Sequence, residues 1–522
     1  MKKIIKIFTA SCILCTGACS SDTEKNNKSI IADTAQTYRP LYHFTTDSNW
    51  INDPNGLVYF NGKYHLFAQY NPFGNVWGHM SWAHAVSNDL FTWNEWPLAL
   101  PEIKNADSTS TMIFSGSVVV DSFNTSGFGK DGQIPLVAIY TSQHDKNGIG
   151  IGQNQSLSYS LDEGKIWQQY ANNPVLDIKL KDFRDPKVFW FASKKKWLMI
   201  VSKPLEYKVQ FYESKNLKDW NLLSEFGNMG NIDKVWECPD FIELPVDGTN
   251  EKKWVLTVST GHPQKGYLAM QYFTGNFDDE KFTVDANPYP LYVDFGRDYY
   301  AGVTYNNIPF PDGRVIMIGW ANCWNYANDI PTKGFRGMYA VPRTLALKRL
   351  PQGLRLMQEP VAEIKKFEEE LFKSKSTRLN NSTKQLEKAS GAALDISFSL
   401  QANAGSTAGI NILKSSDEET TISYSADTKT ITLDRSHSGN TSFNNSFAGA
   451  DSVKILSASN TVQIRILIDK SIVELFVNDG VYTITDLVFP KYAASNAVEL
   501  FSKNGTALFT NILINKVNKT MH

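Results

Sequence analysis

Between residues 38 and 345, hydrophobic and polar positions follow a pattern that occurs five times. Each unit has a polar motif, a hydrophobic run of strand length, a turn, and a second run rich in aromatic residues. In the first unit the runs 57–60 and 64–70 flank Asn61 and Gly62, a pair typical of the tight turn in a β-hairpin. The pattern therefore predicts one small antiparallel sheet per unit.

The five units begin at polar motifs that contain Asp53, Ser115, Asp185, Glu237 and Asp298. Small sheets repeated in this way cannot bury themselves singly and are typical of a β-propeller. An array of ordinary β-sandwich strands is the alternative. The register favours the propeller, because each motif stands just before the first strand of its unit. All five motifs would then meet at one end of the central axis and form one pocket.

Beyond Arg343 the pattern changes. In the charged segment 359–375, apolar residues recur at roughly helical spacing, which predicts a linker with a short helix over residues 346–378. From residue 379 to 522, short alternating strands with Ser, Asn and Gly turns predict a β-sandwich. The predicted fold class is all-β, with a five-bladed β-propeller over residues 38–345 followed by a C-terminal β-sandwich.

The first residues have the form of an export signal, with Lys2, Lys3 and Lys6 before an apolar run that ends at Ala18. We predict a lipoprotein signal peptide over residues 1–19, lipidation of Cys19, and a polar tether over residues 20–37. Secretion with cleavage nearby is the alternative. The apolar run is shorter than the roughly 20 residues of a membrane-spanning helix. We therefore expect membrane contact only through a lipid anchor, at the periplasmic face or the outer surface of a bacterial cell envelope.

Composition narrows the function classes. The net charge is -1, so the chain lacks the positive field that nucleic-acid binding requires. After the export segment only Cys238 and Cys323 remain, which excludes a disulfide framework. The 8 His are scattered without metal-ligand spacing, so we expect a metal-free site and no cofactor. The 13 Trp, 22 Tyr and 30 Phe suit a β-rich core, and aromatic faces also suit sugars.

Three of the polar motifs supply carboxylates, namely Asp53, Asp185 and Glu237. Cleavage of a glycosidic bond needs a proton donor for the leaving oxygen and a carboxylate for the cationic sugar. Each residue taken singly has a simpler explanation, because Asp before Pro commonly starts a turn. Three carboxylates in the same register of a repeat favour a glycosidase site.

These motifs also carry a resemblance. The segments WINDPNG at 50–56, FRDP at 183–186 and WECPD at 236–240 resemble the signature blocks of glycoside hydrolase family 32, the invertases, inulinases and levanases. The likeness covers nearly all of the mature chain and includes FSGS at 114–117, with Phe335 standing where Trp is frequent. The family implies a five-bladed propeller joined to a C-terminal β-sandwich, and hydrolysis with retention of configuration.

The resemblance also implies residue roles. Asp53 is the expected nucleophile and Glu237 the expected acid/base, while Asp185 stays ionised and binds fructose hydroxyls. The expected substrate-binding residues are Asn52, Gln69, Trp77, Phe114, Ser115, Arg184 and Trp320.

The expected function is release of fructose from the ends of fructans such as levan and inulin, with sucrose as a further candidate substrate. An endo-levanase that cuts within the chain is the nearest alternative. An arabinan-type hydrolase would invert configuration, with water between more widely spaced carboxyls. A non-catalytic glycan-binding surface protein on the same fold would be expected to have lost a carboxylate, and this chain has all three.

Overall fold

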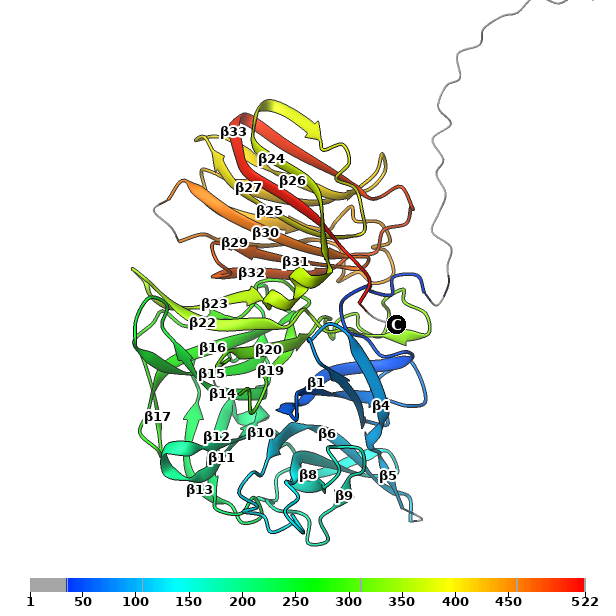
Figure 1. The fold of residues 1–522 in the computed structure, drawn as a ribbon, viewed down its shortest axis with the longest axis vertical. Coiled ribbons are helices and arrows are strands. Elements are labelled where there is room, and N and C mark those ends of the chain that lie inside the picture. Colours follow the sequence, from blue (N-terminus) through cyan, green and yellow to red (C-terminus); the bar gives the residue numbers. More distant parts are fainter. Residues whose placement is uncertain (1–33, 35, 106, 310–311, 457–458, 521–522) are drawn as a thin grey trace, which may run out of the picture.

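The structure is a computed structural model that describes residues 34, 36–105, 107–309, 312–456 and 459–520. The signal peptide, Cys19 and most of the predicted tether lie outside the described residues. Figure 1 shows two parts, a ring of small sheets below and a layered β-domain above. Among the described residues, none of the helices has the length and apolar content needed to cross a membrane.

The lower part is a β-propeller, as predicted from the repeat. Within the described residues its five blades are antiparallel sheets whose inner strands β1, β6, β10, β14 and β19 contact one another in a ring. The first three blades contain β1 (Asn49–Phe60), β2 (Lys63–Asn71), β3 (Ser81–Ser87) and β4 (Trp93–Leu100); β5 (Ile103–Lys104), β6 (Thr109–Val120), β7 (Leu136–Lys146), β8 (Ile149–Ser160) and β9 (Gln168–Gln169); and β10 (Arg184–Phe191), β11 (Lys196–Lys203), β12 (Lys208–Ser214) and β13 (Asn221–Gly227), with 3-10 turns at Ala192–Lys194 and Pro204–Glu206. The other two contain β14 (Glu237–Pro245), β15 (Lys252–Gly261), β16 (Leu268–Phe277), β17 (Phe282–Val284) and β18 (Leu291–Tyr292); and β19 (Tyr300–Thr304), β20 (Val315–Trp320), β22 (Arg343–Leu350) and β23 (Gly353–Pro360).

Tryptophan side chains close turns in the first three blades. The indole N–H groups of Trp93, Trp167 and Trp220 donate to backbone carbonyls three residues earlier, at 3.1, 2.9 and 3.1 Å. The ring itself is closed by β21 (Phe335–Arg336), which pairs in parallel with β1. A segment from the end of the propeller thus completes its first blade.

The fifth blade extends past the predicted boundary at residue 345. Strands β22 and β23 are its outer strands and end at Pro360. The predicted linker over 346–378 is therefore mostly sheet, because a 3-10 helix at Ala362–Phe367 is followed at once by β24 (Glu368–Gln385). Most side chains of β24 are exposed and many are charged, so the alternation typical of a strand was not visible in the sequence. The predicted helix corresponds only to the short 3-10 helix at Ala362–Phe367.

The upper part is the predicted β-sandwich. Its sheets share the long strand β33 (Ala497–Val517), which pairs with β26 through its first third and with β25 through its last half. β24 also runs along β33. The other strands are β25 (Ala393–Ala402), β26 (Thr407–Lys414), β27 (Thr420–Ser425), β28 (Thr430–Asp434), β29 (Ala450–Lys454), β30 (Thr461–Asp469), β31 (Ile472–Val477) and β32 (Tyr482–Leu487).

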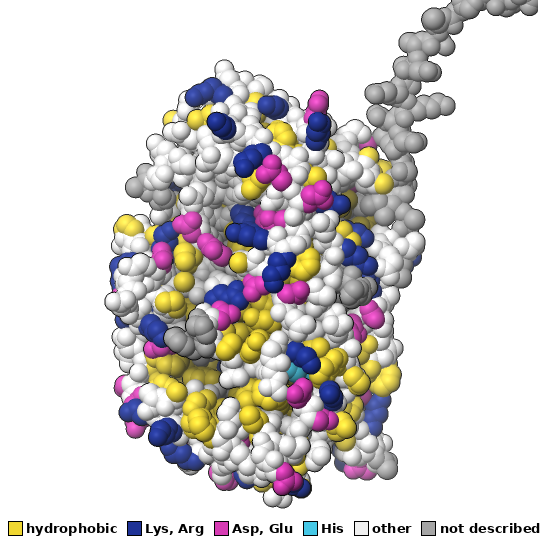
Figure 2. Space-filling view, in the orientation of Figure 1, with side chains coloured by type: hydrophobic (Ala, Val, Ile, Leu, Met, Phe, Trp, Pro, Cys, Tyr) yellow, Lys and Arg dark blue, Asp and Glu magenta, His cyan; other side chains and the backbone are white. Residues whose placement is uncertain are grey.

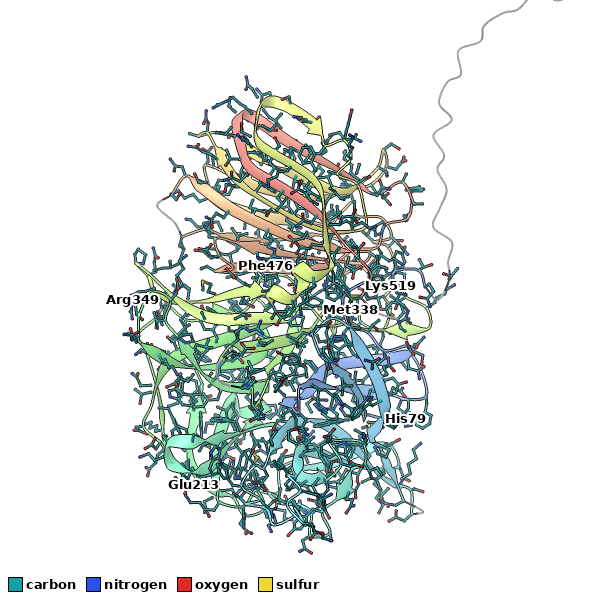
Figure 3. All side chains as sticks on the ribbon, viewed as in Figure 1. His79, Glu213, Met338, Arg349, Phe476 and Lys519 are labelled. Carbon is teal, nitrogen blue, oxygen red and sulfur yellow. The ribbon has the colours of Figure 1, made fainter. Side chains whose placement is uncertain are left out.

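Buried charges join the two parts. The guanidinium of Arg343, at the start of β22, contacts Asp294 at 2.9 Å and Glu474 of β31, and all three side chains are fully buried. His43 lies between Asp469 at 3.0 Å and Glu474 at 2.8 Å. Figure 3 labels Phe476, which lies under Arg343, on the sandwich side of this interface. On the outer surface, Figure 2 shows charges of both signs interspersed and hydrophobic side chains gathered mainly on the propeller.

Candidate active site

A pocket of about 700 Å³ lies where the inner strands of the blades begin. The inner strand of every blade contributes at least one residue to the lining. Among these residues are Asp53 on β1, Ser115 on β6, Asp185 on β10, Glu237 on β14 and Tyr300 on β19. The convergence predicted from the register of the repeat is therefore present in the structure.

The backbone at each of these positions departs from regular sheet. Every one of the five inner strands has a shift in its pairing register at the residue that it contributes. In three of them the chain adopts left-handed backbone, with φ of 66° at Asp185, 44° at Cys238 and 52° at Ala301. A β-bulge turns a side chain away from its regular direction and is common next to active sites. The strand ends are thus shaped to aim these side chains into the pocket.

Asp53 is held by donors on both of its carboxylate oxygens. Its Oδ2 accepts from the hydroxyl of Ser115 at 2.6 Å and from the thiol of Cys238 at 3.3 Å. Its Oδ1 accepts from the amide of Asn52 at 3.1 Å, and Asn52 is fixed in turn by the indole N–H of Trp50 at 2.8 Å. The carboxylate therefore has a fixed orientation in the pocket.

Glu237 has a different environment. Its Oε1 accepts from two nitrogens of Arg184, at 3.0 and 3.3 Å, and its Oε2 accepts from the hydroxyl of Tyr300 at 2.6 Å. The side chain is about a quarter exposed. Glu237 is thus positioned by groups from both neighbouring blades while it still faces the open pocket.

Asp185 is the most buried of the three carboxylates. Its Oδ2 accepts from the backbone N–H of Cys238 at 2.9 Å and lies 4.0 Å from Arg184. Its own backbone N–H donates to Thr141 at 2.9 Å. Asp185 therefore links the inner strands of the third and fourth blades beneath the pocket.

Crowding of these carboxylates changes their proton affinity. Burial and the nearby Glu237 raise the pKa of Asp53, against the hydrogen bonds from Ser115 and Asn52. Burial, Glu237 and Asp53 also raise the pKa of Asp185 to about 7, against the lowering effect of Arg184. The direction of this shift favours the protonated carboxyl group, and the ionised state expected for Asp185 stays a prediction.

Most of the residues predicted to bind substrate line the pocket, namely Asn52, Gln69, Trp77, Phe114, Ser115 and Arg184. Trp77 is 42% exposed and contacts Phe114 edge-on, which places both at the rim. Trp320 is the exception, because it is fully buried and packs against Trp50 and Trp324. Trp324 of the same aromatic cluster lines the pocket, whereas Trp320 lies behind it.

Several residues of the pocket were not among those predicted from the sequence. Tyr300 could have been predicted, because the motif at 298–301 has the same register as the other four. A polar hairpin of the second blade was not, and it supplies Gln143, Asp145 and Gln153 to the lining. Gln153 connects this hairpin to the carboxylates, since its Oε1 accepts from Arg184 at 3.4 Å while its amide donates to Gln143 at 2.8 Å.

Comparisons with known proteins agree with this architecture. Residues 43–360 match the family model of the glycosyl hydrolases family 32 N-terminal domain, and residues 363–516 match that of the family 32 C-terminal domain. The chain is 41% identical over 531 residues to the levanase of Bacillus subtilis (strain 168), covering 99% of this chain and 75% of that protein. It is 40% identical over 505 residues to the extracellular exo-inulinase of Aspergillus awamori, covering 90% of this chain and 93% of that protein.

Solved structures show the same likeness. The crystal structure of exo-inulinase from Aspergillus awamori superposes with a TM-score of 0.87 at 37% identity, covering 93% of this chain and 99% of that one. A fructofuranosidase from Schwanniomyces occidentalis complexed with fructose has a TM-score of 0.83 at 29% identity, covering 94% of this chain and all of that one. With both of its domains matched by the family models, the chain belongs to glycoside hydrolase family 32 and is a glycoside hydrolase.

Proposed function

We propose that the protein hydrolyses β-fructofuranosidic bonds in fructans, with Asp53 as nucleophile and Glu237 as acid/base. The observation that carries the proposal is the pairing of these two carboxylates in one pocket with different surroundings. Asp53 is oriented by short hydrogen bonds at the base of the pocket, whereas Glu237 is partly exposed beside Arg184 and Tyr300. One carboxylate is suited to attack and the other to exchange protons with substrate and water.

The reaction would proceed in two displacements. In the first, Glu237 gives its proton to the glycosidic oxygen while Asp53 attacks the anomeric carbon of the fructosyl unit, so the leaving group departs as an alcohol and a fructosyl ester forms. In the second, Glu237 takes a proton from water, which attacks the same carbon and releases Asp53 as a carboxylate. Two inversions at one carbon give net retention.

Asp185 would bind hydroxyl groups of the fructosyl unit. A protonated carboxyl group can donate one hydrogen bond and accept others, so a pKa of about 7 allows Asp185 to act as donor or acceptor near neutral pH. Asn52, Gln69 and Arg184 line the same end of the pocket and add further polar contacts.

Release of single units from chain ends is the mode that the pocket supports best. Trp77, Phe114 and Trp324 place large side chains around it. Further along the inner strands, the ammonium group of Lys187 on β10 bonds to Asp240 of β14 at 3.2 Å and to the carbonyl of Thr304 of β19 at 2.6 Å, which joins three blades. A pocket narrowed by large side chains suits a terminal sugar, whereas cutting within a chain needs an open cleft.

Two relatives of this chain are named levanase and exo-inulinase, so levan and inulin are the proposed substrates and sucrose the third to test. A chromatographic time course on each decides between the modes. We expect free fructose from the first time points. Early oligosaccharides with little fructose would instead identify an endo-acting enzyme. In the same samples, NMR should detect the β-anomer of fructose first, and an early α-anomer would contradict Asp53 as nucleophile.

We further propose that the enzyme is exported, since a relative is an extracellular enzyme, and that it is anchored through a lipid on Cys19, since the run from Thr16 to Cys19 resembles a bacterial lipobox. Fractionation of cells that express the full chain tests this. Cys19→Ala should move the activity from the membrane fraction to the soluble secreted fraction. Unchanged membrane association of that variant would exclude the lipid anchor.

A further inference from the structure

Tyr300 lines the pocket and directly follows a segment that contacts the sandwich domain. Its hydroxyl donates to Glu237 at 2.6 Å, and the residue begins β19. The preceding segment, residues 293–299, does not belong to a blade strand and lies against the sandwich strand β32. The conformation of this segment decides where the Tyr300 hydroxyl is placed.

Backbone pairing fixes the segment to β32. The N–H of Phe295 donates to the carbonyl of Thr483 at 2.9 Å, and the N–H of Asp298 donates to the carbonyl of Thr485 at 3.1 Å. Gly296 permits the close approach, because a Cβ atom there would lie 2.2 Å from the Thr485 carbonyl oxygen. The segment is thus held as closely as a strand within a sheet.

The side chain of Asp298 fixes the end of the segment, two residues before Tyr300. Its Oδ2 accepts from Arg435 and from the N–H of Leu487 at 2.8 Å, and its Oδ1 accepts from Tyr326 at 2.6 Å. Arg435 follows the sandwich strand β28, and Asp298, Arg435 and Tyr326 are each at most 1% exposed.

Arg435 is itself held rigidly. Its nitrogens donate to the carbonyl of Phe447 at 2.9 Å, to that of Leu487 at 3.0 Å and to the hydroxyl of Tyr326 at 2.8 Å. The guanidinium also lies 4.1 Å from the centre of the Phe447 ring. Lysine cannot reproduce this planar set of donors.

We infer that Arg435 of the sandwich is a positioning residue for the glycosidase reaction, acting through Asp298 and Tyr300 on Glu237. The inference rests on the proposed role of Glu237. Arg435 does not line the pocket. By holding Asp298, it fixes the direction of the Tyr300 hydroxyl that donates to Glu237. Small displacements of a catalytic group lower rates strongly even when their cause is remote. The sandwich would then contribute to the chemistry as well as to folding.

The test is a double-mutant cycle on the full chain with Tyr300→Phe and Arg435→Lys, read as kcat and as the pH dependence of kcat/KM on sucrose or inulin. Each single variant should lower kcat by about threefold to thirtyfold. Each should also move the alkaline limb, the fall of kcat/KM at high pH, to a higher pH, because a hydrogen bond that favours ionised Glu237 is lost or weakened. In the Tyr300→Phe background, Arg435→Lys should have little further effect. Equal effects in both backgrounds, or an unmoved alkaline limb, would overturn the inference.

Two further variants keep the test decisive. Tyr326→Phe removes one donor from Asp298 and can be used if Arg435→Lys fails to fold. It should shift the alkaline limb in the same direction by a smaller amount, and no shift would count against the proposed role of Arg435. Arg465→Lys is the matched control, since Arg465 pairs with Asp395 at 2.6 Å within the sandwich and should leave the limb in place.

Glu237→Gln distinguishes failure of the proposed function from failure of this inference. If Glu237→Gln keeps its activity, the proposed function fails. If Glu237→Gln is inactive but the Tyr300 and Arg435 variants show no coupling, only the inference fails.

Discussion

Two clusters of buried charge in this protein contain the same types of residue but differ in the ratio of cations to carboxylates. At the domain interface each carboxylate meets a cation, with Arg343 on Asp294 and Glu474, and His43 between Glu474 and Asp469. In the pocket Arg184 contacts Asp185 and Glu237, and Asp53 is held by the neutral donors Ser115 and Asn52. The interface cluster has two cations for three carboxylates, whereas the pocket cluster has one cation for three.

The pKa values follow this difference. Burial raises the pKa of Glu474, but Arg343 and His43 outweigh it and lower the pKa overall. Burial lowers the pKa of His43, yet its hydrogen bonds to Asp469 and Glu474 raise it to about 9. In the pocket the pKa of Asp53 and of Asp185 is raised. We therefore expect the interface charges to contribute to folding stability and the pocket carboxylates to lower it when they are ionised.

The largest expected effect is the loss of activity when a pocket carboxylate is neutralised. Asp53→Asn and Glu237→Gln should each lower kcat by about 10² to 10⁴, because each removes one chemical step. Thermal unfolding should stay unchanged or move slightly upward, since a crowded negative charge has been removed. More than about a tenth of the original turnover in either variant would refute the role assigned to that residue.

The converse change at the interface should affect folding. Glu474→Gln leaves Arg343 and His43 buried with less compensating charge and should lower the free energy of unfolding by about 3–5 kcal/mol. Denaturant titration measures the loss, and kcat of the folded fraction reports on the pocket. Glu251→Gln is the control, because its exposed pair with Arg349, labelled in Figure 3, should contribute less than about 1 kcal/mol. A similar loss in both variants would contradict the comparison.

His43 gives the interface a pH signature. Its folded pKa of about 9 lies above the unfolded value near 6.5, so its stabilisation is fully present below pH 6.5 and is lost as pH rises through 9. His43→Gln should therefore lower the free energy of unfolding by about 2–3 kcal/mol more at pH 6 than at pH 10. Equal losses at both pH values would show that His43 is neutral in the folded protein.

The smallest effect has the opposite sign. The folded pKa of Asp185 lies above its unfolded value, so the cost of ionising it grows as pH rises from about 4 to 7 and is fully present above 7. Asp185→Asn should raise the free energy of unfolding by about 1–2 kcal/mol at pH 8 and leave it unchanged at pH 4, while activity falls. Asparagine can still accept the N–H of Cys238. Destabilisation at pH 8 would mean that Asp185 is stabilised as an anion in the pocket.

The five-bladed architecture and the candidate carboxylates could be predicted from the sequence. Alternation of apolar positions, the Asn-Gly turn and a five-fold register depend on local backbone geometry and strand periodicity, which neighbouring residues encode. The same register placed Asp53, Asp185 and Glu237 at one end of the axis, and the structure brings them into one pocket.

Features that depend on neighbours distant in the sequence become visible only in the folded chain. The choice between Trp320 and Trp324 at the pocket wall, and the strands within the predicted linker at 346–378, follow from packing between blades and domains. The proton affinity of Asp185 depends on carboxylates 52 and 132 residues away in the chain, at Glu237 and Asp53. Burial and Coulomb interactions depend on distance in space, and the order of residues alone does not contain that distance.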